Sequence, residues 1–95
     1  MVANAGPMFR LGQIVATPGA LAALTEAGQS PTEFLSRHVC GDWGDCEEED
    51  RQANDDAIKH GDRILSVYST SKGEKIWVIT EHDRSSTCIL LPDEY

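Results

Sequence analysis

Three segments between residues 63 and 91 decide the fold of this 95-residue chain, because each alternates apolar with polar residues. They are RILSVYS (63–69), KIWVITE (75–81) and STCILL (86–91). Period-two alternation of β-branched and aromatic residues is typical of strands. The intervening segments TSKGE and HDRS have the length of hairpin loops. The sequence therefore predicts a three-stranded antiparallel β-meander in the last third of the chain.

Large side chains are expected on both faces of this sheet. In the alternation, Leu65 and Val67 oppose Ile64 and Tyr68, and Ile76 and Val78 oppose Trp77 and Ile79. A sheet with two apolar faces needs cover on each. We therefore expect helices on one face, partial cover from the N-terminal segment on the other, and Trp77 in the core.

A short strand and a helix are predicted before residue 30. The segment QIVA (Gln13–Ala16) has β-branched character and is long enough for a short strand. Thr17 is a good N-cap, and Pro18 suits the first helical position, where no hydrogen bond is lost through its missing N–H. Leucines recur at helical spacing up to Gly28, a typical C-terminal cap. These signals predict a helix over Pro18–Ala27.

The segment SPTE (30–33) is the strongest local signal in the chain. The Ser30 hydroxyl and the Glu33 carboxylate are spaced to form a reciprocal capping box. Pro31 again occupies the first helical position, and Gly41 follows the last apolar residues. The sequence therefore predicts a second helix over Pro31–Val39.

A third helix is expected after the turn GDWGD (41–45), whose two glycines and two aspartates are typical turn residues. Asp45 is the expected N-cap, with Glu48 three residues later as its capping-box partner. The helix should run to His60 and stop at Gly61. The predicted class is α+β, with N-terminal helices and a short strand packed on a C-terminal meander. Residues 1–8 are expected to form a flexible tail and 9–95 a single domain.

The composition excludes several classes of function. Sixteen Asp and Glu against eight Lys and Arg give a net charge of −8, which argues against a broad basic face for nucleic acid or anionic lipid. No apolar run approaches the ~18–20 residues of a membrane span, and residues 1–9 lack the pattern of a secretory signal. Three cysteines are too few for a disulfide scaffold. We expect a cytoplasmic protein with reduced thiols, although the spacing of Cys40 and Cys46 permits a disulfide.

Nearly all of the net charge lies between residues 42 and 56. This segment has Arg51 as its only base and eight acids: Asp42, Asp45, Glu47, Glu48, Glu49, Asp50, Asp55 and Asp56. Acids at a helix start are stabilised by the helix dipole, and Glu47 is spaced to pair with Arg51, so a solvated helix start explains the pattern without a partner. The alternative is an acidic interaction surface.

The charge density bears on the second interpretation. Fifteen helical residues span ~22 Å, and duplex DNA carries ~13 phosphates over that length. Eight carboxylates reach more than half of this density, so the segment is a candidate mimic of nucleic-acid phosphates. Trp43, between two glycines, either packs the turn onto the sheet or, if exposed, serves as an apolar anchor. A calcium loop is disfavoured, because residues 42–47 do not match the EF-hand register.

Sites for metal or catalysis are weakly indicated. His38, Cys40, Cys46 and His60 lack the paired C-x₂₋₄-C spacing of structural zinc sites. An acidic neighbourhood opposes the thiolate that a cysteine nucleophile requires. The strand-to-helix turn at residues 15–20 has neither the lysine nor the G-x-G spacing of phosphate-binding loops. We predict no catalytic residue, no metal and no cofactor.

Several blocks of the sequence together resemble a family of small uncharacterised bacterial proteins carried on plasmids and integrating elements. The blocks are GQIVATPGAL (12–21), SPTEFLSRH (30–38), GDWGD (41–45), GDRILSVY (61–68), KIWVITEHDR (75–84) and ILLPDEY (89–95). The resemblance covers most of the chain from about Phe9. In that family the positions of Cys46 and Cys88 more often hold Leu and Thr, which further disfavours zinc and thiol chemistry. The resemblance implies a mobile-genetic-element setting and no mechanism.

Charge and setting together predict a non-enzymatic inhibitor of anti-defence type, similar in role to anti-CRISPR proteins. Its partner would be a protein with a basic surface, such as the nucleic-acid-binding site of a CRISPR effector, with no direct binding of nucleic acid or membrane. The expected partner-binding residues are Asp42, Trp43, Asp45, Glu47, Glu48, Glu49, Asp50, Asp55 and Asp56. Two alternatives remain: an antitoxin-like or regulatory partner of a neighbouring gene product, and a small metal-dependent enzyme using His38 and Cys40.

Overall fold

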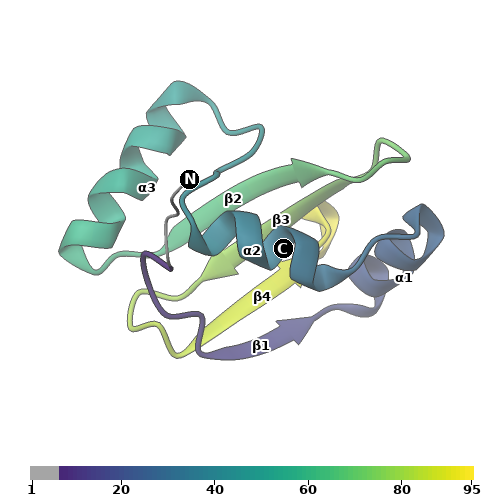
Figure 1. The fold of residues 1–95 in the computed structure, drawn as a ribbon, viewed down its shortest axis with the longest axis horizontal. Helices are drawn as coiled ribbons and strands as arrows, with labels where there is room; N and C mark the ends of the chain where they lie inside the picture. The colour runs from purple at the N-terminus through teal and green to yellow at the C-terminus, as the bar shows by residue number, and fades with distance from the viewer. Residues whose placement is uncertain (1–6) are drawn as a thin grey trace, which may run out of the picture.

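A computed structural model describes residues 7–95 of the chain (Figure 1). Most of the predicted tail, residues 1–6, lies outside the described residues. Met8 lies within them, and its amide donates to the Val39 carbonyl at 2.8 Å. The elements in chain order are β1 (Gln13–Ala16), α1 (Pro18–Ala27), α2 (Pro31–Val39), α3 (Glu48–His60), β2 (Ile64–Ser69), β3 (Lys75–Thr80), β4 (Ser86–Leu90) and the 3₁₀ turn η1 (Pro92–Glu94).

The four strands form one mixed sheet in the order β1-β4-β3-β2. Strands β2, β3 and β4 pair antiparallel in succession, as the alternation predicts. The predicted three-stranded antiparallel sheet is nevertheless wrong, because β1 adds a fourth strand parallel to β4, from Gln13↔Ser86 to Ala16↔Ile89. Residues more than seventy positions apart make this pairing, so no local turn signal indicates it. The α+β class is confirmed.

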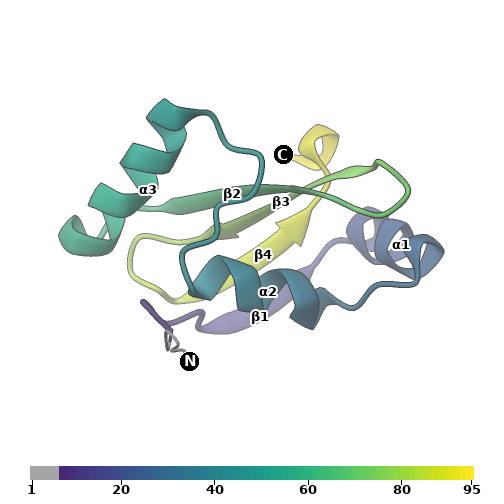
Figure 2. The same ribbon diagram turned by 45° about the horizontal axis from the view of Figure 1, so that its top comes forward.

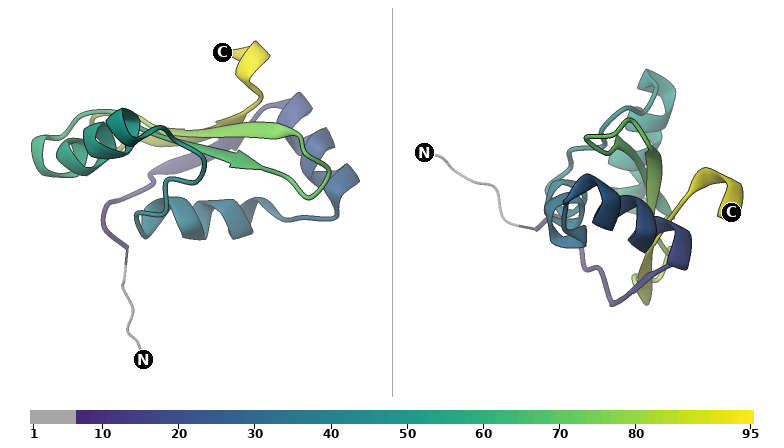
Figure 3. Two further views of the ribbon diagram at one scale, coloured as in Figure 1. Left: turned by 90° about the horizontal axis from the view of Figure 1, so that it is seen from above. Right: turned by 90° about the vertical axis from the view of Figure 1, so that its right-hand side faces the viewer.

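The helices cover one face and two ends of the sheet (Figures 2 and 3). Helix α2 lies under one face, α1 lies at the end of the sheet where β1 leaves it, and α3 flanks β2. The main core forms between α1, α2 and the strands, from Ala20, Leu24, Phe34, Leu35, Tyr68, Ile76, Val78 and Ile89. A smaller cluster of Trp43, Ala57 and Ile64 lies beneath α3.

The second face of the sheet carries η1 rather than the N-terminal segment (Figure 3). The expected cover from the N-terminal segment is wrong, because that segment enters the sheet as β1. Tyr95 lies over Trp77 instead, with ring centroids 5.6 Å apart. Trp77 is half-buried, so its predicted place in the core is also wrong. With the Tyr95 ring against it, the Trp77 side chain still keeps part of its surface in water.

Two of the three predicted helix caps differ from expectation. The Thr17 hydroxyl accepts from the Ala20 amide at 3.2 Å, as expected for the N-cap of α1. The Ser30 hydroxyl caps the Thr32 amide, and the Glu33 carboxylate accepts from Gln29, so the predicted capping box of α2 does not form.

Helix α3 begins at Glu48, two residues later than the predicted N-cap at Asp45 implies. Its N-cap, Glu47, makes no side-chain capping bond. The predicted cap Asp45 accepts instead from the Ser69 hydroxyl and the Lys75 ammonium. These partners belong to the β2–β3 hairpin, so the tertiary contact competes with the local cap and prevails.

Candidate functional site

The predicted acidic segment divides into paired and unpaired carboxylates. Asp42 is paired, because the Arg37 guanidinium lies 2.8 Å from its carboxylate. This hydrogen bond, assisted by the Gly44 amide, holds the pKa of Asp42 below its ordinary value. Asp42 therefore contributes less negative potential than its charge suggests.

Asp45 is also paired. Its Oδ2 lies 3.2 Å from the Lys75 ammonium and accepts from the Ser69 hydroxyl at 2.9 Å. The two hydrogen bonds lower the pKa of Asp45. Asp42 and Asp45 thus fix the loop between α2 and α3 on the rest of the fold.

Four consecutive acids at the start of α3, Glu47 to Asp50, are exposed. Among residues 7–95, no ion pair or side-chain hydrogen bond involves any of them. The predicted Glu47–Arg51 pair does not form, because Arg51 donates to the Gly44 carbonyl at 3.0 Å. Nothing in the described fold neutralises these four carboxylates.

The two remaining acids of α3 make polar contacts with uncharged partners. Asp55 accepts from the indole N–H of Trp43 at 3.0 Å, and Asp56 accepts from the Gln52 amide at 3.3 Å. Both residues are exposed. We use the name acidic surface for Glu47, Glu48, Glu49, Asp50 and Asp56.

Trp43 lies inside the molecule, with 3% of its surface exposed. Its ring stacks on Phe9 at 6.2 Å and meets the edge of His38 at 6.0 Å. The burial supports the interpretation that Trp43 packs the turn onto the sheet. Trp43 is therefore not available as an exposed anchor for a partner, in contrast to the sequence-based expectation.

A buried polar chain centred on His38 was not anticipated from the sequence. His38 Nδ1 lies 2.6 Å from the Ser66 hydroxyl, and Nε2 lies 2.9 Å from the Thr80 hydroxyl. The Thr80 and Thr87 hydroxyls are 2.7 Å apart, and Thr87 donates to the Leu11 carbonyl at 2.7 Å. All four side chains are fully buried.

The terminal carbonyl fixes the direction of every proton in this chain. A carbonyl only accepts, so Thr87 donates to it and receives from Thr80. Thr80 then receives from His38 Nε2–H, and Nδ1 of a neutral ring accepts from Ser66. Burial lowers the pKa of His38 to about 4 from an ordinary 6.5, which agrees with a neutral imidazole.

The hydrogen bonds of the buried polar chain disfavour the alternative of a metal-dependent enzyme. Both nitrogens of His38 are occupied by hydroxyls, so the ring is not oriented toward Cys40 as a ligand. Cys46 donates to the Leu65 carbonyl at 3.4 Å, so the Cys40–Cys46 disulfide is not formed. Burial raises the pKa of the Cys46 and Cys88 thiols, which disfavours their nucleophilic thiolate form.

The sequence holds a signal that could have found the polar chain. Ser66, Thr80 and Thr87 each share an inward-facing register with buried aliphatic residues of the same strand. Polar residues at such positions require partners inside the core. Their partner, His38, lies on the buried side of α2.

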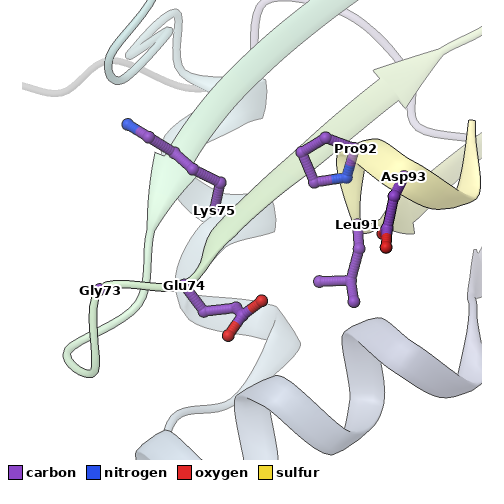
Figure 4. A pocket seen from close by; sticks show the side chains of 6 residues that line it. All are labelled: Gly73, Glu74, Lys75, Leu91, Pro92 and Asp93. Carbon is purple, nitrogen blue, oxygen red and sulfur yellow. The ribbon is translucent and has the colours of Figure 1, made fainter.

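A shallow pocket of about 340 Å³ lies between the β2–β3 turn and η1 (Figure 4). Its lining residues are Gly73, Glu74, Lys75, Leu91, Pro92 and Asp93. The Lys75 side chain points away from Glu74 and Asp93 in Figure 4, and its ammonium pairs with Asp45. The lining includes no histidine, cysteine or hydroxyl side chain.

Comparisons with protein-family models, curated proteins and solved structures found no match for this chain. Within residues 7–95, no three His, Cys, Asp or Glu side chains are grouped so that they could hold a metal ion. No described helix combines the length and the apolar character needed to cross a membrane. The candidate functional site therefore rests on geometry and charge, and the acidic surface is its strongest feature.

Proposed function

We propose that the protein is a non-enzymatic inhibitor that binds a basic protein surface through the acidic surface of α3. The observation that carries this proposal is the run of four exposed carboxylates, Glu47 to Asp50, none of which is in an ion pair among the described residues. The dipole of α3 favours negative charge at this end of the helix. The run of acids and the helix dipole therefore place the highest density of negative charge at the exposed start of α3.

The chemistry of the surface indicates the kind of partner. Closely spaced carboxylates on a helix can bind lysine and arginine side chains in the same way as the phosphates of nucleic acid do. The resemblance to proteins of plasmids and integrating elements favours a cytoplasmic host-defence complex, such as a CRISPR effector or a restriction enzyme. The acidic surface would occupy the site that such a complex uses for nucleic acid.

The burial of Trp43 sharpens the expected mode of binding. Without this residue as an apolar anchor, charge pairing supplies most of the attraction. Asp42 and Asp45 contribute less, because Arg37 and Lys75 already pair with them. Electrostatic complementarity acts mainly on the association rate and is screened by salt. We therefore expect fast, strongly salt-dependent association.

A matched pair of triple variants tests the proposal. The first, Glu48→Gln/Glu49→Gln/Asp50→Asn, removes three charges from the acidic surface. The control, Glu26→Gln/Glu74→Gln/Asp93→Asn, removes the same number and types of charge from exposed positions elsewhere. Both proteins have equal net charge, so any difference between them reports position rather than total charge.

The measurements are inhibition of purified CRISPR and restriction effectors and association rates over a salt series. The first triple variant should associate about tenfold more slowly and lose most of its salt dependence. The control should stay close to the wild type. Equal effects of the two variants, or binding that does not respond to salt, would rule the mechanism out.

A further inference from the structure

We propose that the outer edge of β1 is a self-association site, at which two copies of the chain pair their β1 strands antiparallel. The two four-stranded sheets would then join into one sheet of eight strands. The inference concerns the edge of the sheet opposite the acidic surface, so it goes beyond the proposed function and does not depend on it.

Among the described residues, the backbone groups on the outer side of β1 have no hydrogen-bond partner. The Gln13 amide donates to the Ser85 carbonyl and the Thr17 amide to the Ile89 carbonyl, both at 3.0 Å. The direction of the backbone hydrogen bonds alternates along a strand. The N–H and C=O groups of residues 13, 15 and 17 therefore point toward β4, and those of Ile14 and Ala16 point away from it. β1 ends the sheet order, and no other described strand pairs with it. Two amides and two carbonyls therefore face outward.

The other edge of the sheet shows how this fold covers such groups. On β2, the Asn54 side chain donates to the Leu65 carbonyl at 2.6 Å and accepts from the Leu65 amide at 3.0 Å. The Val67 amide donates to the Trp43 carbonyl, and the Val67 carbonyl accepts from the Asp45 amide. Every outward group of Leu65 and Val67 is paired. β1 has no comparable cover, and an open edge is a template for another strand.

The side chains of β1 favour a protein partner over water. Ile14 and Val15 are 49% and 43% exposed, and both are β-branched. Of the five large exposed hydrophobic residues in the described chain, four fall between residues 8 and 21. Exposed apolar residues next to an open strand edge are typical of an interface rather than a solvated edge.

Charge identifies the partner as a second copy. Residues 11–25 contain no charged side chain, although the whole chain carries −8. The carboxylate near the end of β1, Glu94, is held by Thr17 and by the amides of Gly19 and Leu91. Two copies of a strongly acidic chain repel each other least through an uncharged edge.

The sheet order also keeps the acidic surfaces apart in the proposed dimer. Helix α3 packs against β2, which is the edge farthest from β1 (Figure 1). With strands ~4.8 Å apart, the two β2 strands of an eight-stranded sheet are separated by about 34 Å. This is about four Debye lengths at physiological salt. Repulsion between the two acidic surfaces therefore destabilises the dimer very little.

One register uses all four outward groups. Ile14 pairs with Ala16 of the partner subunit, and Ala16 with Ile14 of the partner subunit, which makes four hydrogen bonds. Val15 then lies on the two-fold axis, directly opposite Val15 of the partner subunit, as a non-hydrogen-bonded pair. Each large Ile14 side chain lies beside a small Ala16. The contact is short, so we expect a dimer of micromolar or weaker affinity.

Sedimentation velocity over about 0.1 µM to about 1 mM tests self-association, since this range brackets micromolar and weaker affinities. The wild type should shift from monomer to dimer across the series. Ile14→Pro removes an outward N–H and leaves the bonds to β4 in place, so it should fold and remain monomeric. Ile14→Thr keeps both the N–H and the β-branch and should still dimerise. If Ile14→Pro does not fold, Ile14→Lys provides the second blocked edge.

Cysteine substitution tests the register. Val15→Cys should form an intermolecular disulfide under mild oxidation, whereas Ile14→Cys should not, since its counterpart is Ala16. Both are made in a Cys88→Thr background, because Cys88 lies opposite Val15 in the ladder. A monomer at all concentrations, or a dimer that survives in Ile14→Pro and Ile14→Lys, overturns the interface. Cross-linking of Ile14→Cys in preference to Val15→Cys overturns the register.

Discussion

The two edges of the sheet differ in whether the rest of the chain pairs their outward backbone groups. At β2, a buried asparagine and a loop segment pair every outward group of Leu65 and Val67. At β1, Ile14 and Ala16 have no described strand beside them, and Ile14 is half exposed. The comparison shows where the fold uses tertiary structure to complete its hydrogen bonds and where it leaves them open. The covered edge faces the acidic helix, and the open edge faces away from it.

The buried polar chain links these two regions. It runs from Ser66 on β2 through His38 and the two threonines to the Leu11 carbonyl, just before β1. Each hydroxyl and ring nitrogen in it has a partner, so the chain satisfies the polar groups of the core. It also fixes the register of three strands and helix α2 relative to one another.

Removing the aromatic support of the covered edge should have the largest effect. Trp43→Ala deletes a side chain that is 3% exposed, its packing against Phe9 and His38, and its bond to Asp55. We expect a loss of about 3–5 kcal/mol in the free energy of unfolding. Urea unfolding followed by circular dichroism measures it. Trp77→Ala, at a half-buried tryptophan, is the control and should cost less.

Acid should weaken the buried polar chain through His38. Above pH 6.5 the His38 ring is neutral in the folded and the unfolded protein, and the buried polar chain contributes fully to stability. Between pH 6.5 and about 4 the unfolded chain binds a proton that the folded chain does not, so stability falls as pH falls. The loss attributable to His38 is about 3 kcal/mol and is complete near pH 4. Unfolding in urea at a series of pH values measures this slope.

A His38→Gln variant provides the comparison for this pH dependence. It should be less stable at pH 7, because Ser66 and Thr80 lose well-placed partners. Its stability should change little between pH 6.5 and 4. Carboxylates with lowered pKa values, such as Asp42 and Asp45, lose their contribution only at lower pH. Equal slopes for the variant and the wild type would contradict the assignment to His38.

Uncovering the β2 edge should have a smaller effect on stability and a visible effect on solubility. Asn54→Ala leaves the Leu65 amide and carbonyl without their partners. We expect a loss of about 2–3 kcal/mol and a greater tendency to aggregate, since the edge becomes available to other strands. Thermal melts and light scattering measure the two effects. Gln52→Ala, on the exposed side of α3, should change stability by less than about 0.5 kcal/mol.

A change at the open edge should have the smallest effect on the monomer. In dilute protein, Ile14→Pro should alter the free energy of unfolding by less than about 1 kcal/mol, because the lost N–H has no partner in the monomer. Val15→Pro should be much more destabilising, since its N–H faces β4. Comparison of the two variants in chemical unfolding tests which side of β1 is bonded. Equal losses would contradict the alternation of bonds along this strand.

Elements with local signals were predicted well from the sequence. Thr17, Pro18 and Gly28 bracket α1 at the predicted residues, and Pro31 begins α2. The three C-terminal strands lie within a residue or two of their predicted limits. Caps, helix-favouring prolines and period-two alternation act over a few residues, so the sequence shows them directly.

Features that depend on distant partners were predicted poorly. The Asp45 cap failed because Ser69 and Lys75 offer its carboxylate stronger bonds than the local amides. The prediction that Trp43 is an exposed anchor was wrong, because Phe9, His38 and Asp55 surround its ring. The acidic segment was visible as composition. Its division into paired and unpaired carboxylates depends on which bases the fold brings close, Arg37 to Asp42 and the distant Lys75 to Asp45.

By itself the sequence determined the α+β class, the limits of most elements and the concentration of negative charge before β2. Only the tertiary structure decided that β1 joins the sheet as an open parallel edge, that Asn54 covers the opposite edge and that His38 is held neutral in the core. The reason is the distance along the sequence over which each kind of interaction acts. Backbone propensity and capping are set by neighbours in sequence, whereas strand order and the pairing of buried polar groups are set by which residues meet once the chain has folded.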